Sequence, residues 1–512
     1  MTTYASKALL IALSATAVAA GLTATGSASA SAASADSAAV IPSAGLVWTE
    51  CAVTHPHLKP RPLPGQECAT LSVPLDYSDP RGRQVGIAVS RLRSDDPGER
   101  RGALAVIPGG PGSSGVQRLT TKAEALRREL GGTYDLVAMD PRGVGGSVRA
   151  NCRLEEDDRR MVTLRSWPGA DGSIAENVAR SRRTAEACAR NGGEELASMT
   201  TANQARDLDR FRQALGEEKL SAWGVSYGTY VGAVYAQRFP HRTDRWVLDS
   251  SNDPDPRRVA RGWLAYLGQG AEDRFPDFAA WAAHPDRAPQ GLRLAERPED
   301  VRPLVIALAE RLDRAPAEST TPGAPLTGTV FRQALQNALY SDAAFAGFAR
   351  LVVDAQDPRT KPALPPELAA ALPDEDVAMM VGVICNDVSW PRSVAAHERA
   401  VAADRVRHPL TAGFPVNITP CSFWKAPAEK PTRITDRGPS NILMIQSLRD
   451  PSTPYAAGLK MRAALGDRAR LVSVGQGGHG MYVGNGNACG NAAVTEFLRT
   501  GKRPARDTYC AN

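Results

Sequence analysis

The chain has 512 residues, of which 43% are hydrophobic and 23% charged, and this balance excludes a disordered or fibrous protein. Its 61 basic and 55 acidic residues give a formal net charge of +6 and are spread without a long block of either sign. The charge therefore predicts neither a nucleic-acid partner nor binding to an anionic membrane surface.

The first 44 residues predict a targeting segment and a leader. Lys7 precedes the apolar run 8–22, and the small residues Ala-Ser-Ala follow at 28–30, which is the pattern of a secretory signal peptide. The run is shorter than the roughly 20 residues of a membrane-spanning helix, so a membrane anchor is the weaker alternative. We predict a signal peptide over 1–30, a leader or pro-segment over 31–44, and a secreted, extracellular mature protein that is not membrane-bound.

The eight cysteines form an even set without a C-x-x-C pair. In an exported protein this favours disulfides over a metal site, so no metal and no cofactor are expected. Pairing neighbours in order along the chain is one hypothesis, which would close four local loops, and the sequence leaves the connectivity open. The eight residues are Cys51, Cys68, Cys152, Cys188, Cys385, Cys421, Cys489 and Cys510.

Six short apolar runs bounded by Gly, Pro or Asp are typical of buried strands. Between the second and third runs, Leu208, Phe211 and Leu215 recur at helical spacing before Gly216. Strands that alternate with helices predict a doubly wound, mostly parallel α/β sheet. The runs are 103–107, 134–139, 220–224, 245–249, 441–446 and 470–474.

Helical, Pro-rich and Ala-rich sequence interrupts this rhythm between about 251 and 430, after which strand-like runs resume. The simplest organisation is a core in two pieces, over 45–250 and 431–512. The interruption, 251–430, is then a large and mainly helical lid insertion.

The segment GVSYG, Gly224 to Gly228, lies between a predicted strand and a helix predicted over 227–239. A serine at such a corner has a strained backbone and needs small neighbours, which is the nucleophile elbow of α/β-hydrolases. An ordinary tight turn is the alternative interpretation. We predict Ser226 as a catalytic nucleophile on an α/β-hydrolase fold.

A nucleophilic serine needs a base and an orienting acid, and in this fold they follow it along the chain as Asp or Glu and then His. Asp450 follows the run 441–446, and His479 follows the run 470–474. Both positions fit these roles. Asp249, at the end of another strand, is the rival acid.

The negative oxygen formed during attack needs hydrogen-bond donors. The backbone N–H of Tyr227, directly after the nucleophile, is one candidate, and the loop PGGPGSSG over 108–115 is expected to supply the second. Phosphate binding by this loop is disfavoured because it lacks the Walker lysine and the G-x-G-x-x-G spacing.

Six motifs together make the sequence resemble the secreted tripeptidyl aminopeptidases of actinobacteria, relatives of the proline iminopeptidases in the α/β-hydrolase superfamily. Pro108 stands where iminopeptidases usually have histidine, which favours the tripeptidyl branch. The resemblance implies Ser226 as nucleophile, Asp450 as acid, His479 as base and Gly110 as second oxyanion donor. The motifs are GGPG (109–112), DPRGVGGS (140–147), GVSYGTYVGAVYAQRFP (224–240), ICND (384–387), RDPSTP (449–454) and GGHG (477–480).

The resemblance implies a serine exopeptidase that releases short peptides, tripeptides in particular, from free N-termini of peptides or proteins through an acyl-enzyme. A buried α-ammonium group needs a carboxylate partner, for which Asp387 is the candidate, although it could instead cap a helix. A secreted carboxylesterase or lipase with the same residues is the alternative function. A non-catalytic binding protein on the same scaffold is a further alternative.

Overall fold

The structure, a computed structural model, describes residues 45–51 and 61–511, which belong to a single unit. The predicted signal peptide, 1–30, and leader, 31–44, lie outside the described residues. No helix of the described part is long and apolar enough to cross a membrane.

Within the described residues, ten strands form one sheet in the order β1-β2-β3-β5-β4-β6-β7-β8-β9-β10. The pairs β1–β2, β2–β3 and β3–β5 are antiparallel, and every other neighbouring pair is parallel. The strand order reverses between β4 and β6, and ligands of open α/β sheets bind at the carboxyl ends of strands at such a point. The strands are β1 (Thr49–Glu50), β2 (Gln66–Pro74), β3 (Gln84–Leu92), β4 (Ala103–Ile107), β5 (Asp135–Met139), β6 (Leu220–Val225), β7 (Thr243–Asp249), β8 (Ile442–Arg449), β9 (Ala469–Gly477) and β10 (Thr508–Cys510).

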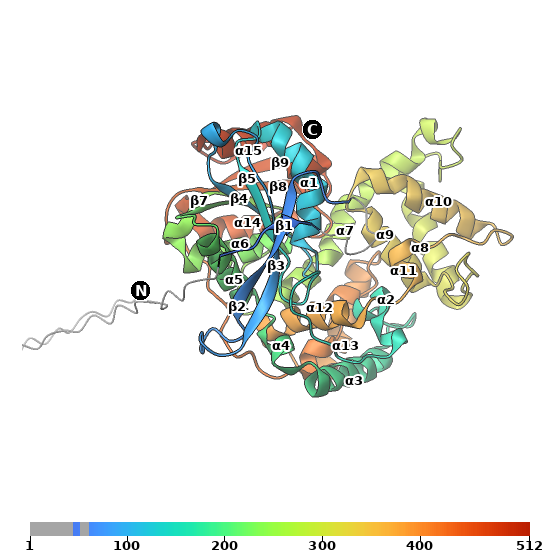
Figure 1. The fold of residues 1–512 in the computed structure, drawn as a ribbon. Coiled ribbons are helices and arrows are strands. Elements are labelled where there is room, and N and C mark those ends of the chain that lie inside the picture. Colours follow the sequence, from blue (N-terminus) through green and yellow to red (C-terminus); the bar gives the residue numbers. More distant parts are fainter. Residues whose placement is uncertain (1–44, 52–60, 512) are drawn as a thin grey trace, which may run out of the picture. The chain divides into compact units, whose positions relative to one another are not determined.

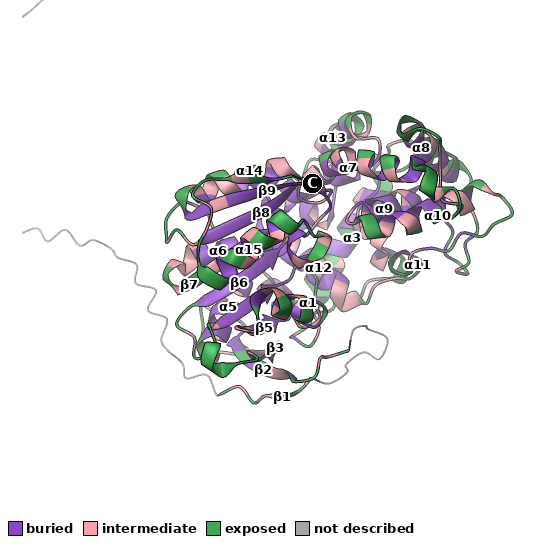
Figure 2. Ribbon diagram, turned by 90° about the horizontal axis from the view of Figure 1, so that it is seen from above, coloured by how far each residue is buried: buried purple, intermediate pink, exposed green. Residues whose placement is uncertain are grey.

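Both faces of the sheet are covered by helices, as Figures 1 and 2 show. In β4, Ala103, Ala105 and Ile107 pack with α5, α6 and α14, whereas Leu104 and Val106 pack with α1 and α15 on the opposite face. Side chains alternate between the faces of a strand, so burial on both sides requires the continuous apolar run found in the sequence. These helices are α1 (Gly115–Leu130), α5 (Thr201–Ala214), α6 (Tyr227–Arg238), α14 (Tyr455–Leu465) and α15 (Ala488–Thr500).

The chain between β7 and β8 is helical and has a hydrophobic core of its own, centred on Phe278, which contacts the rings of Phe345 and Phe348 at 5.3 Å between centroids. Two of its helices also pack into the core that contains α6: α7 through Val259 and Trp263, and α12 through Val377 and Val383. The helices are α7 (Val259–Ala283), α8 (Pro298–Arg314), α9 (Gly328–Ala338), α10 (Phe345–Gln356), α11 (Pro366–Ala369), α12 (Asp374–Asp387) and α13 (Val394–Arg407).

Three more helices between β5 and β6 contact this insertion. The helix α2 (Met161–Leu164) contacts α9 and α11, α4 (Gly193–Ser198) contacts α12, and α3 (Ala175–Asn191) contacts the turn Pro420–Phe423. Val178 of α3 also packs in one hydrophobic cluster with Val394 and Val401 of α13. We propose that the lid over the sheet consists of the predicted insertion, 251–430, together with the segment 151–200.

The predicted fold class is confirmed, and all six predicted strands are present as β4 to β9. Four strands were missed: β1, β2, β3 and β10. In β2 and β3 buried residues alternate with exposed or half-buried ones, because only one face of this antiparallel edge is fully covered. A search for continuous apolar runs does not detect such strands.

Four disulfides join the cysteines as neighbours in order: Cys51–Cys68, Cys152–Cys188, Cys385–Cys421 and Cys489–Cys510. The hypothesis of four local loops is therefore confirmed. A disulfide stabilises mainly by restricting the unfolded chain, by about 3 kcal/mol for loops of this size. Such bonds are typical of proteins in oxidising compartments.

Candidate active site

Ser226 lies at the corner between β6 and α6 with φ +58° and ψ −125°, a backbone conformation that is strained for a residue with a side chain. A Cβ on Gly224 would lie 2.6 Å from the carbonyl oxygen of Gly228, and a Cβ on Gly228 would lie 2.6 Å from the carbonyl oxygens of Ile107 and Pro108. Both flanking glycines are therefore required, because backbones approach too closely for any side chain.

Asp450 and His479 meet at the carboxyl ends of β8 and β9. The Nδ1 atom of His479 lies 2.9 Å from both carboxylate oxygens of Asp450. The fully buried carboxylate also accepts the backbone N–H groups of Ser452 and Thr453 at 2.8 Å and the Thr453 hydroxyl at 2.9 Å. These donors hold the carboxylate in place and compensate for its burial.

Ser226 and His479 line one cavity of about 600 Å³ at the point where the strand order reverses. Both residues are partly exposed. Within the described residues no hydrogen bond joins the Ser226 hydroxyl to the His479 ring. Such bonds are often long without substrate and tighten when it binds. The structure thus brings the two side chains to one cavity and the Asp450–His479 pair into direct contact.

Asp249, the rival acid, has a different set of partners. Its carboxylate accepts the backbone N–H groups of Met481 and Tyr482 at 2.8 and 2.9 Å and the indole N–H of Trp223 at 3.2 Å. Burial raises the pKa of Asp249, and these hydrogen bonds partly offset that effect. Asp249 fixes the chain that follows His479 and makes no hydrogen bond to the imidazole.

The glycine loop after β4 runs directly against the serine. A Cβ on Gly109 would lie 3.0 Å from the Cβ of Ser226, and both Gly109 and Gly110 line the cavity. Asp140 anchors the end of this loop, because its carboxylate accepts the Ser114 hydroxyl at 2.5 Å. The backbone of Tyr227 begins α6 on the other side of Ser226. Both predicted oxyanion donors thus belong to segments next to the nucleophile.

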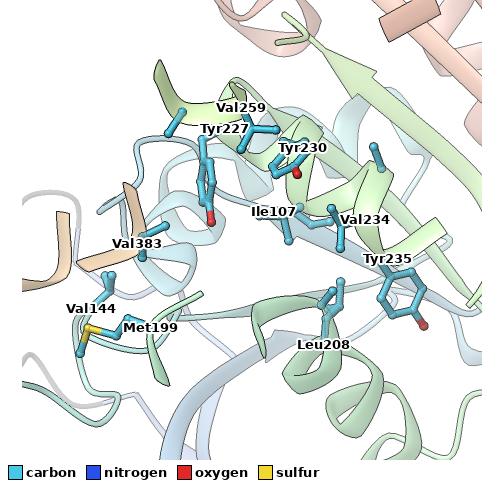
Figure 3. Close-up of a cluster of buried hydrophobic side chains, with 14 of the residues drawn as sticks. Ile107, Val144, Met199, Leu208, Tyr227, Tyr230, Val234, Tyr235, Val259 and Val383 are labelled. Atoms are coloured by element: carbon cyan, nitrogen blue, oxygen red, sulfur yellow. The ribbon is translucent and has the colours of Figure 1, made fainter. Parts of the chain in front are cut away.

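The Tyr227 side chain belongs to a buried cluster with Tyr230, Val259 and Val383 (Figure 3). Its hydroxyl lies 2.7 Å from that of Thr201, the first residue of α5. The cluster joins the nucleophile helix to α7 and α12 of the lid.

Asp387 does not line the cavity. Its carboxylate is buried and accepts both the backbone N–H of Thr201, at 2.9 Å, and the Thr201 hydroxyl. A carboxylate on the first N–H groups of a helix satisfies donors that have no partner inside the helix. The contacts of Asp387 are those of the helix-capping alternative, and they connect α12 of the lid to α5 of the core.

Asp387 makes stability depend on pH. Burial raises the pKa of its carboxyl from 3.8 to about 6. Between these values the folded state binds the proton and the unfolded state does not, so this contribution to stability falls as pH rises, by about 3 kcal/mol in total. We expect Asp387→Asn to gain about 3 kcal/mol relative to the wild type between pH 4 and pH 7.

Urea unfolding at four pH values in that range measures this difference. Asp467→Asn is the matched control, because its side chain is fully exposed. A difference between Asp387→Asn and the wild type that stays constant with pH would contradict the assignment.

Sequence reasoning missed Tyr340, which precedes α10 in the lid. Its carbonyl oxygen accepts the backbone N–H of His479 at 2.9 Å, and its ring meets the imidazole edge at 5.1 Å between centroids. Its hydroxyl donates to the Ser452 hydroxyl at 3.0 Å. Nothing in its sequence neighbourhood marks this residue, because the contact spans more than a hundred positions.

Apart from His479, the charged residues of the described cavity wall are all basic. They are Arg118, Lys122 and Arg165. No Asp or Glu side chain belongs to the described lining. The other lining residues are apolar or neutral, including Trp263, Phe414 and the disulfide Cys385–Cys421.

The doubly wound sheet, the strained serine between β6 and α6, and the hydrogen-bonded Asp and His after β8 and β9 are the features of an α/β-hydrolase. The order Ser, Asp, His along the chain is also that of this class.

Known proteins resemble the chain over most of its length. It is 32% identical over 495 residues to the tripeptidyl aminopeptidase of Streptomyces lividans. The aligned part covers 93% of this chain and 88% of that protein. It is 29% identical over 496 residues to the serine protease Hip1 of Mycobacterium tuberculosis, covering 90% of each. Carboxylesterase B of Mycobacterium tuberculosis is 30% identical over 479 residues, covering 87% of this chain and 86% of that protein.

A family model described as TAP-like protein matches residues 411–510, which include Asp450 and His479. The chain belongs to the tripeptidyl aminopeptidase family. The resemblance inferred from its motifs is thereby confirmed, and the chain is a serine peptidase.

Proposed function

We propose that this peptidase releases short peptides, tripeptides in particular, from free N-termini through an acyl-enzyme on Ser226. The observation that carries the proposal is the hydrogen-bonded Asp450–His479 pair at the cavity that Ser226 lines, in a chain of this family. We further propose that the protein acts outside the cell after export, which the four disulfides support.

The proposed chemistry begins with the imidazole. With its Nδ1–H donated to Asp450, neutral His479 carries a free electron pair on Nε2, which can accept the proton of the Ser226 hydroxyl. The Ser226 oxygen gains negative charge as its proton leaves, and it attacks the scissile carbonyl carbon. Asp450 stabilises the imidazolium that forms, since its negative charge faces Nδ1.

The tetrahedral intermediate places a negative oxygen near the backbone N–H groups of Tyr227 and Gly110, which we assign as its donors. His479 then gives its proton to the leaving amine, and the shortened peptide departs. Water activated by His479 hydrolyses the acyl-enzyme and frees the N-terminal fragment.

Selection of the N-terminal end is assigned to the lid. The cavity is bounded by residues of α7 and α12 and by the disulfide Cys385–Cys421. The cavity volume of about 600 Å³ is within the range of small-ligand sites. We assign to these walls the exclusion of the middle of a polypeptide.

Digestion of an unblocked nonapeptide tests this proposal. We expect successive loss of three-residue units in the product masses, and no products from the same peptide with an acetylated N-terminus. Loss of single residues would change the fragment length that we assign. Equal cleavage of free and acetylated peptides would contradict exopeptidase action.

A carboxylesterase is the second candidate, favoured by two observations. The described cavity lining contains no acidic side chain for an α-ammonium group, and a relative named carboxylesterase B is 30% identical. An assay of a tripeptide anilide beside a short acyl ester separates the candidates. Cleavage of the short acyl ester without detectable cleavage of the tripeptide anilide would favour the esterase.

A further inference from the structure

Arg118 and Lys122 form a cationic pair in the cavity wall that has no part in the proposed mechanism. They lie four residues apart on α1 and therefore on one face of that helix. Neither side chain forms an ion pair within the described residues. Both residues are only partly exposed, and a cation that loses part of its water without gaining an anionic partner is unfavourable, so the pair requires an explanation.

The surroundings of Arg118 leave its charge available. Its guanidinium lies over the Trp223 ring at 4.9 Å from the centroid, and its Nε is buried without a hydrogen-bond partner. The nearby carboxylate of Asp249 lies beyond ion-pair distance and is occupied by the N–H groups of Met481, Tyr482 and Trp223. Desolvation lowers the pKa of Arg118, and the charge of Asp249 offsets this effect only in part.

Lys122 extends the same site. Its ammonium group donates one hydrogen bond, to the carbonyl oxygen of Val483 at 3.1 Å, which leaves further N–H donors. Burial, and then the neighbouring charge of Arg118, lower its pKa. Two adjacent cations that oppose each other's charge are both stabilised when one anion lies between them.

Lys122 connects the pair to the segment that follows His479. Val483, which accepts from Lys122, follows His479 by four residues, and Gly480, Tyr482 and Gly484 of this segment line the cavity with the pair. His479 must face the leaving nitrogen in order to protonate it. The segment of substrate after the scissile bond therefore extends toward α1.

We propose that Arg118 and Lys122 bind a carboxylate carried by the part of the peptide that follows the scissile bond. This inference rests on the proposed function and narrows its substrate class to short oligopeptides whose C-terminal carboxylate, or an acidic side chain directly after the cut, reaches the pair. Bidentate binding of carboxylate by guanidinium suits Arg118 in particular.

Three tetrapeptides with the same first three residues test the proposal: one ending in alanine with a free carboxylate, one ending in alanine amide, and one ending in aspartic acid amide. For the wild type we expect kcat/KM about 10-fold or more higher for the free acid than for the alanine amide. Arg118→Gln should reduce this ratio to near 1 and leave the rate on the alanine amide little changed.

Lys122→Gln is the second variant, which keeps the test decisive should Arg118→Gln fail to fold. Arg128→Gln, at an exposed position of the same helix, is the matched control and should keep the wild-type ratio. Rapid cleavage of the peptide that ends in aspartic acid amide would show that the pair binds a side-chain carboxylate. Rapid cleavage of the free acid alone would show that it binds the C-terminal carboxylate. Equal rates on all three peptides would overturn this inference only, whereas no cleavage of any would overturn the proposed function with it.

Discussion

Replacing Ser226 by alanine is expected to lower kcat by about 10⁵-fold or more, because removal of a nucleophile that acts with its base eliminates the covalent route. The fold should be retained. The serine hydroxyl makes no hydrogen bond within the described residues, and alanine can occupy the same backbone conformation, so no buried partner is left unpaired. Steady-state kinetics on a tripeptide anilide, with thermal unfolding as the check of folding, measure the effect.

Ser72→Ala is the control, since Ser72 is exposed on β2 at the sheet edge. A fluorophosphonate should label the wild type and Ser72→Ala, and should not label Ser226→Ala. Residual activity of more than a few per cent in Ser226→Ala would show that another residue attacks the substrate.

Asp450→Asn is expected to lower kcat by about 10⁴-fold with little change in KM. The asparagine oxygen would accept the backbone N–H groups of Ser452 and Thr453, which turns its NH₂ group toward Nδ1 of His479. The imidazole would then carry its proton on Nε2 and could no longer accept one from Ser226. Kinetics across a range of pH, together with unfolding curves, separate this loss from a loss of folded protein.

Asp249→Asn provides the contrast. Its NH₂ group would face one of the N–H donors of Met481, Tyr482 or Trp223, so the free energy of unfolding should fall by about 1–3 kcal/mol. The fall in kcat should be far smaller than for Asp450→Asn. The reverse order of the two kcat values would identify Asp249 as the acid that serves the imidazole.

Local pattern was sufficient for much of the candidate site. Gly224, Ser226 and Gly228 lie within one turn of chain, and their spacing alone indicates a corner where backbones approach closely. His479 stands out because it follows a buried strand in a glycine-rich segment. The sequence also marked Asp387 as a candidate for burial or helix capping. It could not identify the partner of this residue, because Thr201 lies 186 positions away.

The antiparallel edge shows the same limit in the fold. A strand buried on both faces reads as a continuous apolar run, and the six found this way are the centre of the sheet. In β2 and β3 half-buried residues interrupt the run, and their pairing depends on β5, which follows later in the chain. A strand can be recognised from its own apolar residues only when both of its faces are buried.

The sequence by itself determined the α/β order, the strained serine corner and the two strand ends that carry an acid and a base, because each follows from apolar spacing and glycine positions within a few residues. Tertiary packing decided that Asp450 rather than Asp249 contacts the imidazole and that Asp387 is bound to Thr201. It also placed Arg118 and Lys122 in a cavity wall whose described residues include no carboxylate. These are contacts of a few ångströms between residues far apart in the chain, and they depend on which helices and loops cover each strand end.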